Sequence, residues 1–534
     1  MPIRMEDDPA DPQENSGGGD SGGSGGGGGF GGSGLLALLP LLLGLFRGRG
    51  LILLVVILVG GYFFFGRSGC NLSPLQNVSQ LATGGILDPK QFAKAKIYES
   101  LDEDDSKNPL PESANLQKYA PTVGDQGHQG SCVAWSSAYG ARTIEEAIRT
   151  GKDPNTIKFS PSFLYNQIGM DGCDGSYIQK AMEFMTQKGS VEYDRFPYND
   201  QDCASQPDQQ LIEEAQGYKM RGANRLSAGD RTDAIDLRAI KENLSQGAPV
   251  VIGMMVGGSY MQPMMGQDLW SPTDEDRSMQ GFGGHAQCVV GYDDKKYGGA
   301  FLIMNSWGQQ WGNNGFAWVR YDDFKFFVRE AYGIDPMTKV GAAANEPFEA
   351  EVGLVKISYN NNKAVAGDYI QLRTSGNNMF ETTSPVKMGT RFKMEIKNTS
   401  ECYIYVFGKE TDGTSYTLFP YPNADDQTKT RYSPFCGIAG YRLFPKNKSM
   451  APDSVGTKDF IAVVVSKDSL DWNSINKQIS QNTQQDYASR LNAALGNKLL
   501  QNVHFEATTK GNMHFRVDAN NNHVVACVVA IDKE

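Results

Sequence analysis

Residues 124–151 read GDQGHQGSCVAWSSAYGARTIEEAIRTG, and this stretch decides the fold of the region around it. A glycine-rich loop leads into a run whose apolar residues recur at helical spacing, namely Ala134, Trp135, Ala138, Ala141, Ile144 and Ile148. Ser131 is able to cap the start of such a helix, and Gly151 stands where a C-terminal cap belongs. The pattern therefore predicts a helix that begins at Cys132.

Cys132 would thereby lie at the positive end of a helix dipole. That position favours the charged form of a thiol, so we predict that the pKa of Cys132 is lowered. A thiolate is the nucleophile that acyl transfer requires. The alternative for a lone cysteine beside glycines is a small buried side chain.

A second pattern lies downstream and predicts a β-hairpin. Residues 285–292 alternate as a strand, residues 292–299 (YDDKKYGG) form a turn, and the apolar run 300–304 ends at Asn305. A hairpin folded about Lys295 sets His285 opposite Asn305. Cys132, His285 and Asn305 then supply a nucleophile, a base and a group that orients the base. Taken singly, His285 could be a core histidine and Asn305 a turn residue.

Three blocks of sequence resemble the papain family of cysteine proteases. They are Gln126-Gly-His-Gln-Gly-Ser-Cys132, Gly284-His285-Ala286 and Asn305-Ser-Trp-Gly-Gln-Gln-Trp-Gly-Asn-Asn-Gly315, and they occur in the family's order over about 225 of the 534 residues. The resemblance implies an α+β, papain-like domain with two lobes. The mostly helical lobe would bear Cys132, the β-rich lobe would bear His285 and Asn305, and the substrate cleft would lie between them.

The resemblance also implies catalytic roles. Cys132 would attack the scissile carbonyl and form a thioester, His285 would protonate the leaving amine and then activate water, and Asn305 would fix the imidazole ring. The side-chain amide of Gln126, with the backbone N–H of Cys132, would form the oxyanion hole. A surface glutamine in a glycine-rich loop is the alternative for Gln126. The implied enzyme is a cysteine-type peptidase, a hydrolase.

A substrate-binding wall is implied by the run Gly172-Cys-Asp-Gly-Ser-Tyr177. Backbone groups of Gly175 and Ser176 would pair with an extended peptide, with Tyr177 and Gly284 nearby. Trp307 would screen the hydrogen bond between Asn305 and His285 from water. A simple turn and ordinary packing are the alternatives for these positions.

The chain departs from the family pattern in its cysteines. The family has a half-cystine three residues before the nucleophile and usually an aromatic residue directly after it, and this chain has Gln129 and Val133 at those positions. One family disulfide must therefore be absent. Cys173 and Cys203 occupy two half-cystine positions without their usual partners and either pair with each other or stay free. No spacing of Cys and His indicates a metal site, and we expect neither a metal nor a cofactor.

The N-terminal part of the chain predicts a tail, an anchor and a linker. Residues 1–34 are acidic and then glycine-rich, which is typical of a disordered tail. Residues 35–67 form the predicted membrane anchor, whose uncharged run 50–66 is at the lower limit for a spanning helix. A cleaved signal peptide is the rival, although about fifty residues precede the apolar core. Residues 68–115 indicate a stalk or a short prosegment.

The orientation of this anchor follows from its flanking charges. Arg47 and Arg49 lie on one side and Arg67 on the other, which places the N-terminus in the cytoplasm. The protein would be a single-pass membrane protein whose catalytic domain is periplasmic or extracellular.

The remaining chain divides near residues 341–346. Residues 116–340 would form the catalytic domain and residues 346–534 a β-rich accessory domain, an all-β sandwich by its alternating segments. This C-terminal part resembles an uncharacterised bacterial β-domain, and we expect a bacterial protein in which it recruits substrate or a partner. Its aromatic residues at alternate positions, Tyr403, Tyr405, Phe407 and Phe419, are expected in the core.

The composition narrows the classes of function. A net charge of −11 argues against binding of nucleic acid. The resemblance to the papain family implies a peptide or protein substrate. The leading prediction is a membrane-anchored endopeptidase. A cell-wall amidase or transferase with the same nucleophile is one alternative, and a non-catalytic peptide-binding module that retains the cleft is another.

Overall fold

The computed structural model describes residues 3–9, 83–229, 231–341, 347–360, 363–376, 378–484, 486–501, 503–518 and 524–534. The predicted membrane anchor at 35–67 and most of the predicted tail lie outside these residues. Among the helices in the described ranges, none has both the length and the apolar character needed to cross a membrane.

The helical lobe of the catalytic region is built around the helix that begins at Cys132. This helix runs through α4 (Cys132–Ala134), the π-helical stretch η2 (Trp135–Arg142) and α5 (Thr143–Thr150). Gly151 ends it with φ 71°, donating its N–H to Ala147, as predicted. Ser131 precedes the helix but makes no capping bond, because its hydroxyl pairs with that of Tyr198 at 2.6 Å. The other helices of this lobe are α6 (Pro161–Ile168), α7 (Ile178–Gln187) and α8 (Gln209–Ala215).

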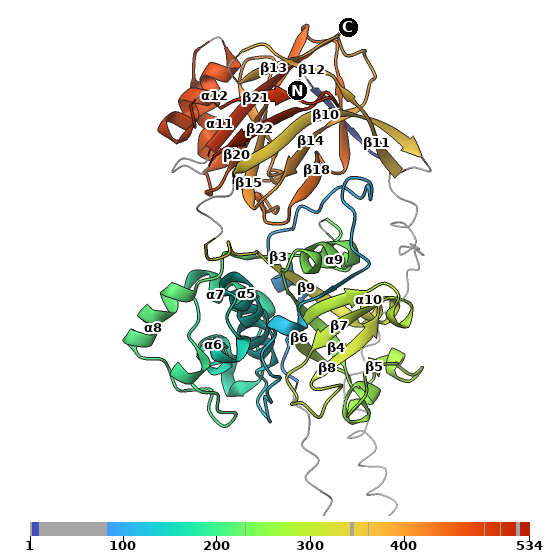
Figure 1. The fold of residues 1–534 in the computed structure, drawn as a ribbon, viewed down its shortest axis with the longest axis vertical. Helices are drawn as coiled ribbons and strands as arrows, with labels where there is room; N and C mark the ends of the chain where they lie inside the picture. The colour runs from blue at the N-terminus through green and yellow to red at the C-terminus, as the bar shows by residue number, and fades with distance from the viewer. Residues whose placement is uncertain are drawn as a thin grey trace, which may run out of the picture. The chain divides into compact units, whose positions relative to one another are not determined.

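The β-rich lobe is one sheet with strand order β3-β9-β4-β6-β7-β8-β5, with β2 also paired to β6. In Figure 1 the helices α5 to α8 gather on one side of the catalytic region, and β4 to β8 on the other. The strands are β2 (Ser113–Asn115), β3 (Ala223–Arg225), β4 (Val250–Val256), β5 (Leu269–Trp270), β6 (Gly283–Asp293), β7 (Ala300–Met304), β8 (Phe316–Arg320) and β9 (Val328–Ile334), accompanied by α9 (Leu237–Ser245) and α10 (Tyr321–Phe327).

The predicted hairpin exists as β6 and β7, but its register differs from the prediction. Cys288 pairs with Met304 and Val289 with Ile303, and a bulge shifts the register by one more residue before Gly291. The predicted pairing of His285 with Asn305 as direct cross-strand partners is therefore wrong by two residues. Asn305 instead lies immediately after β7, from where its side chain reaches back to His285.

The C-terminal region is a sandwich of two sheets. One sheet has the order β1-β19-β14-β10-β22-β21, with β11 and β18 at its side, and the other has the order β12-β13-β23-β20-β15-β16, with β17. The strands are β10 (Phe348–Asn360), β11 (Lys363–Ile370), β12 (Leu372–Thr374), β13 (Met379–Thr382), β14 (Phe392–Asn398), β15 (Cys402–Lys409), β16 (Ser415–Phe419), β17 (Phe435–Cys436), β18 (Gly440–Phe444), β19 (Lys448–Pro452), β20 (Lys458–Ser466), β21 (Phe505–Ala507), β22 (Met513–Val517) and β23 (Val524–Asp532).

Continuous apolar runs in β20 and β23 have a physical reason: both faces of their sheet are covered. Val463 and Val465 belong to the core between the two sheets, whereas Val464 belongs to a second core under α11 (Trp472–Gln481) and α12 (Tyr487–Leu495). These helices pack on the outer face of that sheet (Figure 1). Tyr405, Phe407 and Phe419 are fully buried and Tyr403 is half-buried, so the expected core placement holds.

The first described residues of the chain are ordered, which corrects the prediction of a disordered tail for this part. Ile3–Asp7 form strand β1, which pairs antiparallel with β19, so this part of the predicted disordered segment 1–34 is ordered. Ile3 is 1% exposed and belongs to the core of the sandwich. The acidic composition indicated a disordered tail. Ile3 and Met5 nevertheless alternate with polar residues, which is the pattern of an edge strand.

Residues 83–115 do not form a free stalk, which was one of the two predictions for this segment. Phe92 in α3 (Pro89–Phe92) is fully buried against Tyr332, with ring centroids 5.2 Å apart. β2 extends the catalytic sheet by pairing with β6. The stretch between them bonds to the C-terminal region, where Ile97 exchanges backbone hydrogen bonds with residues 431 and 433. The described part of the linker is thus built into the fold.

The covered outer face of the second sheet gives a stability prediction. Leu491 in α12 is fully buried, so Leu491→Ala should lower the free energy of unfolding by about 2–5 kcal/mol, measured by chemical denaturation. Lys477→Ala, on the exposed face of α11, is the matched control and should change it by less than about 0.5 kcal/mol. Equal effects of the two substitutions would contradict this packing.

Candidate active site

His285 and Asn305 form a buried hydrogen bond. Nε2 of His285 lies 2.7 Å from Oδ1 of Asn305, and Oδ1 also accepts the backbone N–H of Ser306 at 2.8 Å. Because Oδ1 can only accept, Nε2 must carry the hydrogen. In the neutral ring Nδ1 then holds the free electron pair, and Nδ1 is buried without a hydrogen-bond partner in the described part of the chain. The imidazole is therefore held as a base with one nitrogen available.

Trp307 covers this hydrogen-bonded pair. Its ring stacks on His285 with centroids 4.3 Å apart and an interplanar angle of 22°, and it is 3% exposed. Trp311 meets Trp307 edge-on at 5.8 Å. An apolar cover of this kind keeps water from competing for the hydrogen bond, which strengthens it.

Cys132 lies next to the histidine strand. Its Sγ accepts the backbone N–H of Ala286 at 3.4 Å, and the side chain is fully buried. Burial raises the pKa of Cys132 to about 12, so the predicted lowering by the helix dipole is wrong for this arrangement. Removing the thiolate from water outweighs the favourable helix terminus.

Burial also shifts the pKa of His285, in the direction that favours the neutral imidazole. It lowers the pKa of His285 to about 4, although the hydrogen bond to Asn305 opposes the change. At neutral pH the pair is therefore a neutral thiol beside a neutral imidazole. The groups are in place for proton transfer, but the charged pair is not formed while both are shielded from solvent.

Gln126 is fully buried beside these groups. Its Oε1 accepts the hydroxyl of Ser306 at 2.6 Å, and its Nε2 donates to the carbonyl of Gln129 at 2.9 Å. A side-chain amide nitrogen carries two hydrogens, so one remains for a further acceptor. The structure thus brings Gln126 to the site through Ser306, a residue that the sequence reasoning did not single out.

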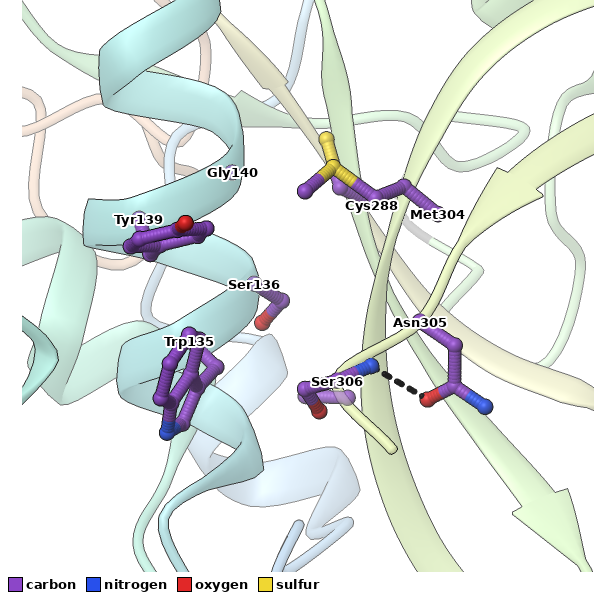
Figure 2. A pocket seen from close by; sticks show the side chains of 9 residues that line it. Trp135, Ser136, Tyr139, Gly140, Cys288, Met304, Asn305 and Ser306 are labelled. Atoms are coloured by element: carbon purple, nitrogen blue, oxygen red, sulfur yellow. Dashed lines mark hydrogen bonds between the residues drawn. The ribbon is translucent and has the colours of Figure 1, made fainter. Parts of the chain in front are cut away.

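A small cavity lies behind Asn305. Figure 2 shows the side chains that line it, from η2 on one side and from β6, β7 and the following turn on the other: Trp135, Ser136, Tyr139, Gly140, Cys288, Met304, Asn305 and Ser306. Its volume of about 10 Å³ suits a single water molecule at most. Cys288 is a buried thiol on this wall, as expected. The cavity therefore lies within the packing around Asn305 and is too small to bind a substrate.

Residues 83–87, which we call the strap, lie across the site. The backbone N–H groups of Gly84 and Gly85 donate to the carbonyl of Gly284, at 3.3 and 3.0 Å. Ser176 donates its N–H to Gly84 at 2.9 Å and accepts that of Ile86 at 3.0 Å. A short parallel bridge thereby ties the strap to one wall of the site.

Close backbone approach explains the glycines at this contact. Gly175 has φ +107°, and a Cβ there would clash with the carbonyl of Gly84. A Cβ on Gly85 would meet the backbone of His285 at 3.0 Å. The strap therefore lies directly on the backbone of β6 at His285.

The side chain of Leu87 fills a pocket in the β-rich lobe. Cβ atoms at Gly253 or Gly284 would collide with it, and Ile178 forms the neighbouring apolar wall. Just beyond, Oε1 of Glu330 accepts the backbone N–H of Asp88 at 2.9 Å. Burial raises the pKa of Glu330 to about 7. The strap thus presents an aliphatic side chain to a pocket that glycines keep open.

The predicted substrate wall is close to the strap. The backbone of Ser176 bonds the strap directly, and Gly175 and Gly284 lie against it. Tyr177 stands at the start of α7, where its carbonyl accepts the N–H of Ala181. Cys173 and Cys203, left open by the sequence, form a disulfide with their Cα atoms 6.0 Å apart.

This chain is similar to known proteins of one family. A model of the papain family of cysteine proteases matches residues 110–335. Mouse (Mus musculus) cathepsin K is 29% identical over 212 residues, which are 39% of this chain and 59% of the relative. Cathepsin B-like CP2 of Giardia intestinalis is 26% identical over 228 residues, 39% of this chain and 69% of the relative. The chain thus spans less than two thirds of the length of cathepsin K.

Solved structures were found as well. Xylellain, a cysteine protease from Xylella fastidiosa, is 24% identical, and the match covers 48% of this chain and 96% of xylellain with a TM-score of 0.39. The residues matched by the family model include Cys132, His285 and Asn305. Residues 110–335 of this chain therefore belong to the papain family of cysteine proteases.

Proposed function

We propose that this chain is an endopeptidase that hydrolyses peptide bonds through Cys132, His285 and Asn305. The observation that carries the proposal is the hydrogen bond from Nε2 of His285 to Asn305, which leaves Nδ1 as the base on the strand that contacts the Cys132 thiol. A nucleophile, a base and an orienting group are the requirements for acyl transfer by a cysteine.

The reaction follows from these positions. The Cys132 thiol gives its proton to Nδ1 of His285, and Sγ attacks the substrate carbonyl carbon. When the C–N bond breaks, His285 returns the proton to the leaving amine, and a thioester to Cys132 remains. Water, deprotonated by His285, then hydrolyses the thioester and restores the thiol. In this proposal the amide of Gln126, which Ser306 holds by a hydrogen bond, stabilises the oxyanion in both steps.

In the described arrangement the enzyme is latent. The strap bonds to Ser176 and Gly284, on the wall that an extended peptide would use, and we propose that it contributes to the shielding of Cys132 and His285, which are both fully buried. Substrate must displace at least residues 84–87 before it reaches Cys132. Displacement also returns water to the thiol and the imidazole, which removes the main cause of their shifted pKa values.

We also propose a location and a role for the parts outside the site. The apolar run 50–66 would attach the protein to a membrane, and the disulfide between Cys173 and Cys203 favours a catalytic region in an oxidising compartment outside the cytoplasm. The C-terminal sandwich would recruit substrate or a partner.

The function is tested with an unfolded protein and with cell-wall muropeptides as substrates, using enzyme whose strap has been weakened. The unfolded protein should be cut, and Cys132→Ser should abolish cutting. Gln126→Ala should lower kcat by about 10²- to 10³-fold because one oxyanion donor is lost. Hydrolysis of muropeptides alone would identify an amidase, and peptide binding without a covalent thioester would identify a non-catalytic module.

The strap gives a second prediction. Leu87→Ser removes the apolar side chain that fills the pocket at Gly253, so the strap should open more often. Peptidase activity and the rate at which iodoacetamide labels Cys132 should both increase. Lys90→Ala, an exposed change just beyond the strap, is the control and should alter neither. Unchanged labelling in Leu87→Ser would show that the strap does not limit access.

The buried thiol gives a third prediction, on pH. With a pKa of about 12, Cys132 in the resting chain should be alkylated about tenfold faster for each added pH unit between pH 6 and 10, since only the thiolate reacts. In Leu87→Ser the rate should be higher at pH 7 and less steep, because exposure lowers the pKa. A resting chain whose rate is already level at pH 7 would contradict the shielding.

A further inference from the structure

Two buried cysteines face each other in the C-terminal sandwich. Cys402 on β15 and Cys436 on β17 are direct partners in an antiparallel ladder, and the register continues beside them, where the N–H of Ile404 donates to the carbonyl of Pro434 at 2.9 Å. Cys402 is 1% exposed and Cys436 is fully buried, and both side chains belong to the core between the two sheets. Both are free thiols in the structure. The fold therefore places two thiols opposite each other in one core.

The ladder holds these two cysteines within bridging range. Direct partners in an antiparallel pair have Cα atoms about 4.5–5.5 Å apart, and their side chains lie on the same face of the sheet. A disulfide spans Cα separations of about 4.4–6.8 Å. The bridge between Cys173 and Cys203 in the catalytic region joins Cα atoms 6.0 Å apart. The backbone positions of Cys402 and Cys436 therefore suit a disulfide.

A buried positive charge lies beside the pair. The side chain of Arg442 is fully buried and donates to Oδ1 of Asn398 at 2.6 Å, while Nδ2 of Asn398 donates to the carbonyl of Cys436 at 3.1 Å. Burial raises the pKa of the Cys436 thiol to about 11, and the charge of Arg442 opposes that change. Burial raises the pKa of Cys402 as well, and there a charge on Cys436 acts in the same direction. Of the two thiols, Cys436 is thus the one that the guanidinium prepares to react first.

A short edge strand covers the two thiols. β17 consists of Phe435 and Cys436, and within the described part of the chain it pairs with β15. Opening a strand of two residues breaks few backbone hydrogen bonds, so it occurs far more often than unfolding of the whole sheet. Such an opening gives a small reagent access to Cys436 and, behind it, to Cys402.

We propose that Cys402 and Cys436 form a redox-active dithiol that a low-molecular-weight disulfide, such as oxidised glutathione, converts to a cross-strand disulfide. The Cys436 thiolate attacks one sulfur of the incoming disulfide, forms a mixed disulfide and releases one thiol. The Cys402 thiol then loses its proton and attacks Sγ of Cys436, which releases the second thiol. The chain gives up two electrons and two protons, and the incoming disulfide takes up both to become two thiols.

The bridge would fix the part of the sandwich that holds the linker. It closes the loop 402–436, in which the carbonyl of Arg431 accepts the N–H of Ile97 at 2.7 Å and Ser433 donates its N–H to the carbonyl of Ile97 at 3.0 Å. A closed loop has fewer open conformations available, so it opens less often. Oxidation would therefore strengthen the hold of the sandwich on the linker. This inference is independent of the proposed peptidase activity.

The first test is a non-reducing peptide map of the full chain. The folded protein is reduced, incubated with oxidised glutathione, denatured and alkylated. We expect a cross-linked peptide that contains Cys402 and Cys436 and is lighter by two hydrogens than its two components together. Cys527, buried on β23 opposite Val463, is the internal control and should be alkylated. Alkylation of both Cys402 and Cys436, or pairing of either with Cys527, would overturn the inference.

The second test establishes which thiol reacts first. Cys402→Ala should collect one glutathione adduct on Cys436, because the thiol that would release it is missing. Cys436→Ala should collect an adduct on Cys402 several-fold more slowly, since the charge of Arg442 favours the thiolate of Cys436. Intact mass against time measures both rates. An adduct that forms on Cys402 as fast as on Cys436 would contradict the proposed order of attack.

The third test measures amide hydrogen exchange in residues 402–436 of the oxidised and the reduced chain. Oxidation should slow exchange there in the unsubstituted chain and should have no effect there in Cys436→Ala or in Cys402→Ala, each of which lacks one half of the bridge. Cys527→Ala is the matched control and should respond to oxidation as the unsubstituted chain does. Equal exchange in the oxidised and reduced forms of the unsubstituted chain would refute the proposed effect of the bridge.

Discussion

The hydrogen bond between His285 and Asn305 is the contact on which the site depends. It links β6 to the residue that follows β7, fixes the tautomer of the imidazole, and directs the unprotonated nitrogen away from Asn305. Around it, Trp307 excludes water, and Ser306 connects the same turn to Gln126. A single turn after a buried strand thus orients the imidazole, covers it and holds the side-chain amide of Gln126.

Burial is the basis of the proposed resting state. The strap bonds to β6 at Gly284 and to the wall at Ser176, and burial raises the pKa of Cys132 and lowers that of His285. Both shifts favour neutral groups, so under the proposed function access and chemical activation are linked: displacement of the strap would also favour the charged pair. The residues after the strap stay pinned by Phe92 and Glu330, so displacement need not remove the segment.

The sequence was informative where spacing reflects local geometry. The helix from Cys132 to Gly151 and the two strands of the hairpin follow from apolar periodicity, and the three resemblance blocks led to the family that the comparisons support. The register was mistaken because the hairpin folds between Lys296 and Tyr297 and not about Lys295, and the residues of the turn do not reveal its exact centre. The direction of the pKa shift of Cys132 was mistaken because the burial of this side chain is a tertiary feature that a helix terminus does not reveal.

Other features of the protein could be recognised only from its tertiary structure. Gly84 and Gly85 stood in a polar stretch that suggested a stalk, and only their close contact with Gly284 and Ser176 reveals a strap. Strand β1 was hidden in an acidic tail because an edge strand of five residues needs little apolar sequence. The disulfide between Cys173 and Cys203 was one of two open alternatives, since pairing depends on distance in space.

The central claim is that Cys132 is an activatable nucleophile that the strap shields. It is tested most directly by the intact mass of the full chain after treatment with an epoxide inactivator of cysteine proteases at neutral pH. The account predicts slow labelling of the resting chain, one stoichiometric adduct in Leu87→Ser, and none when Cys132→Ser is added. Rapid labelling of the resting chain, or an adduct that persists without Cys132, would contradict it.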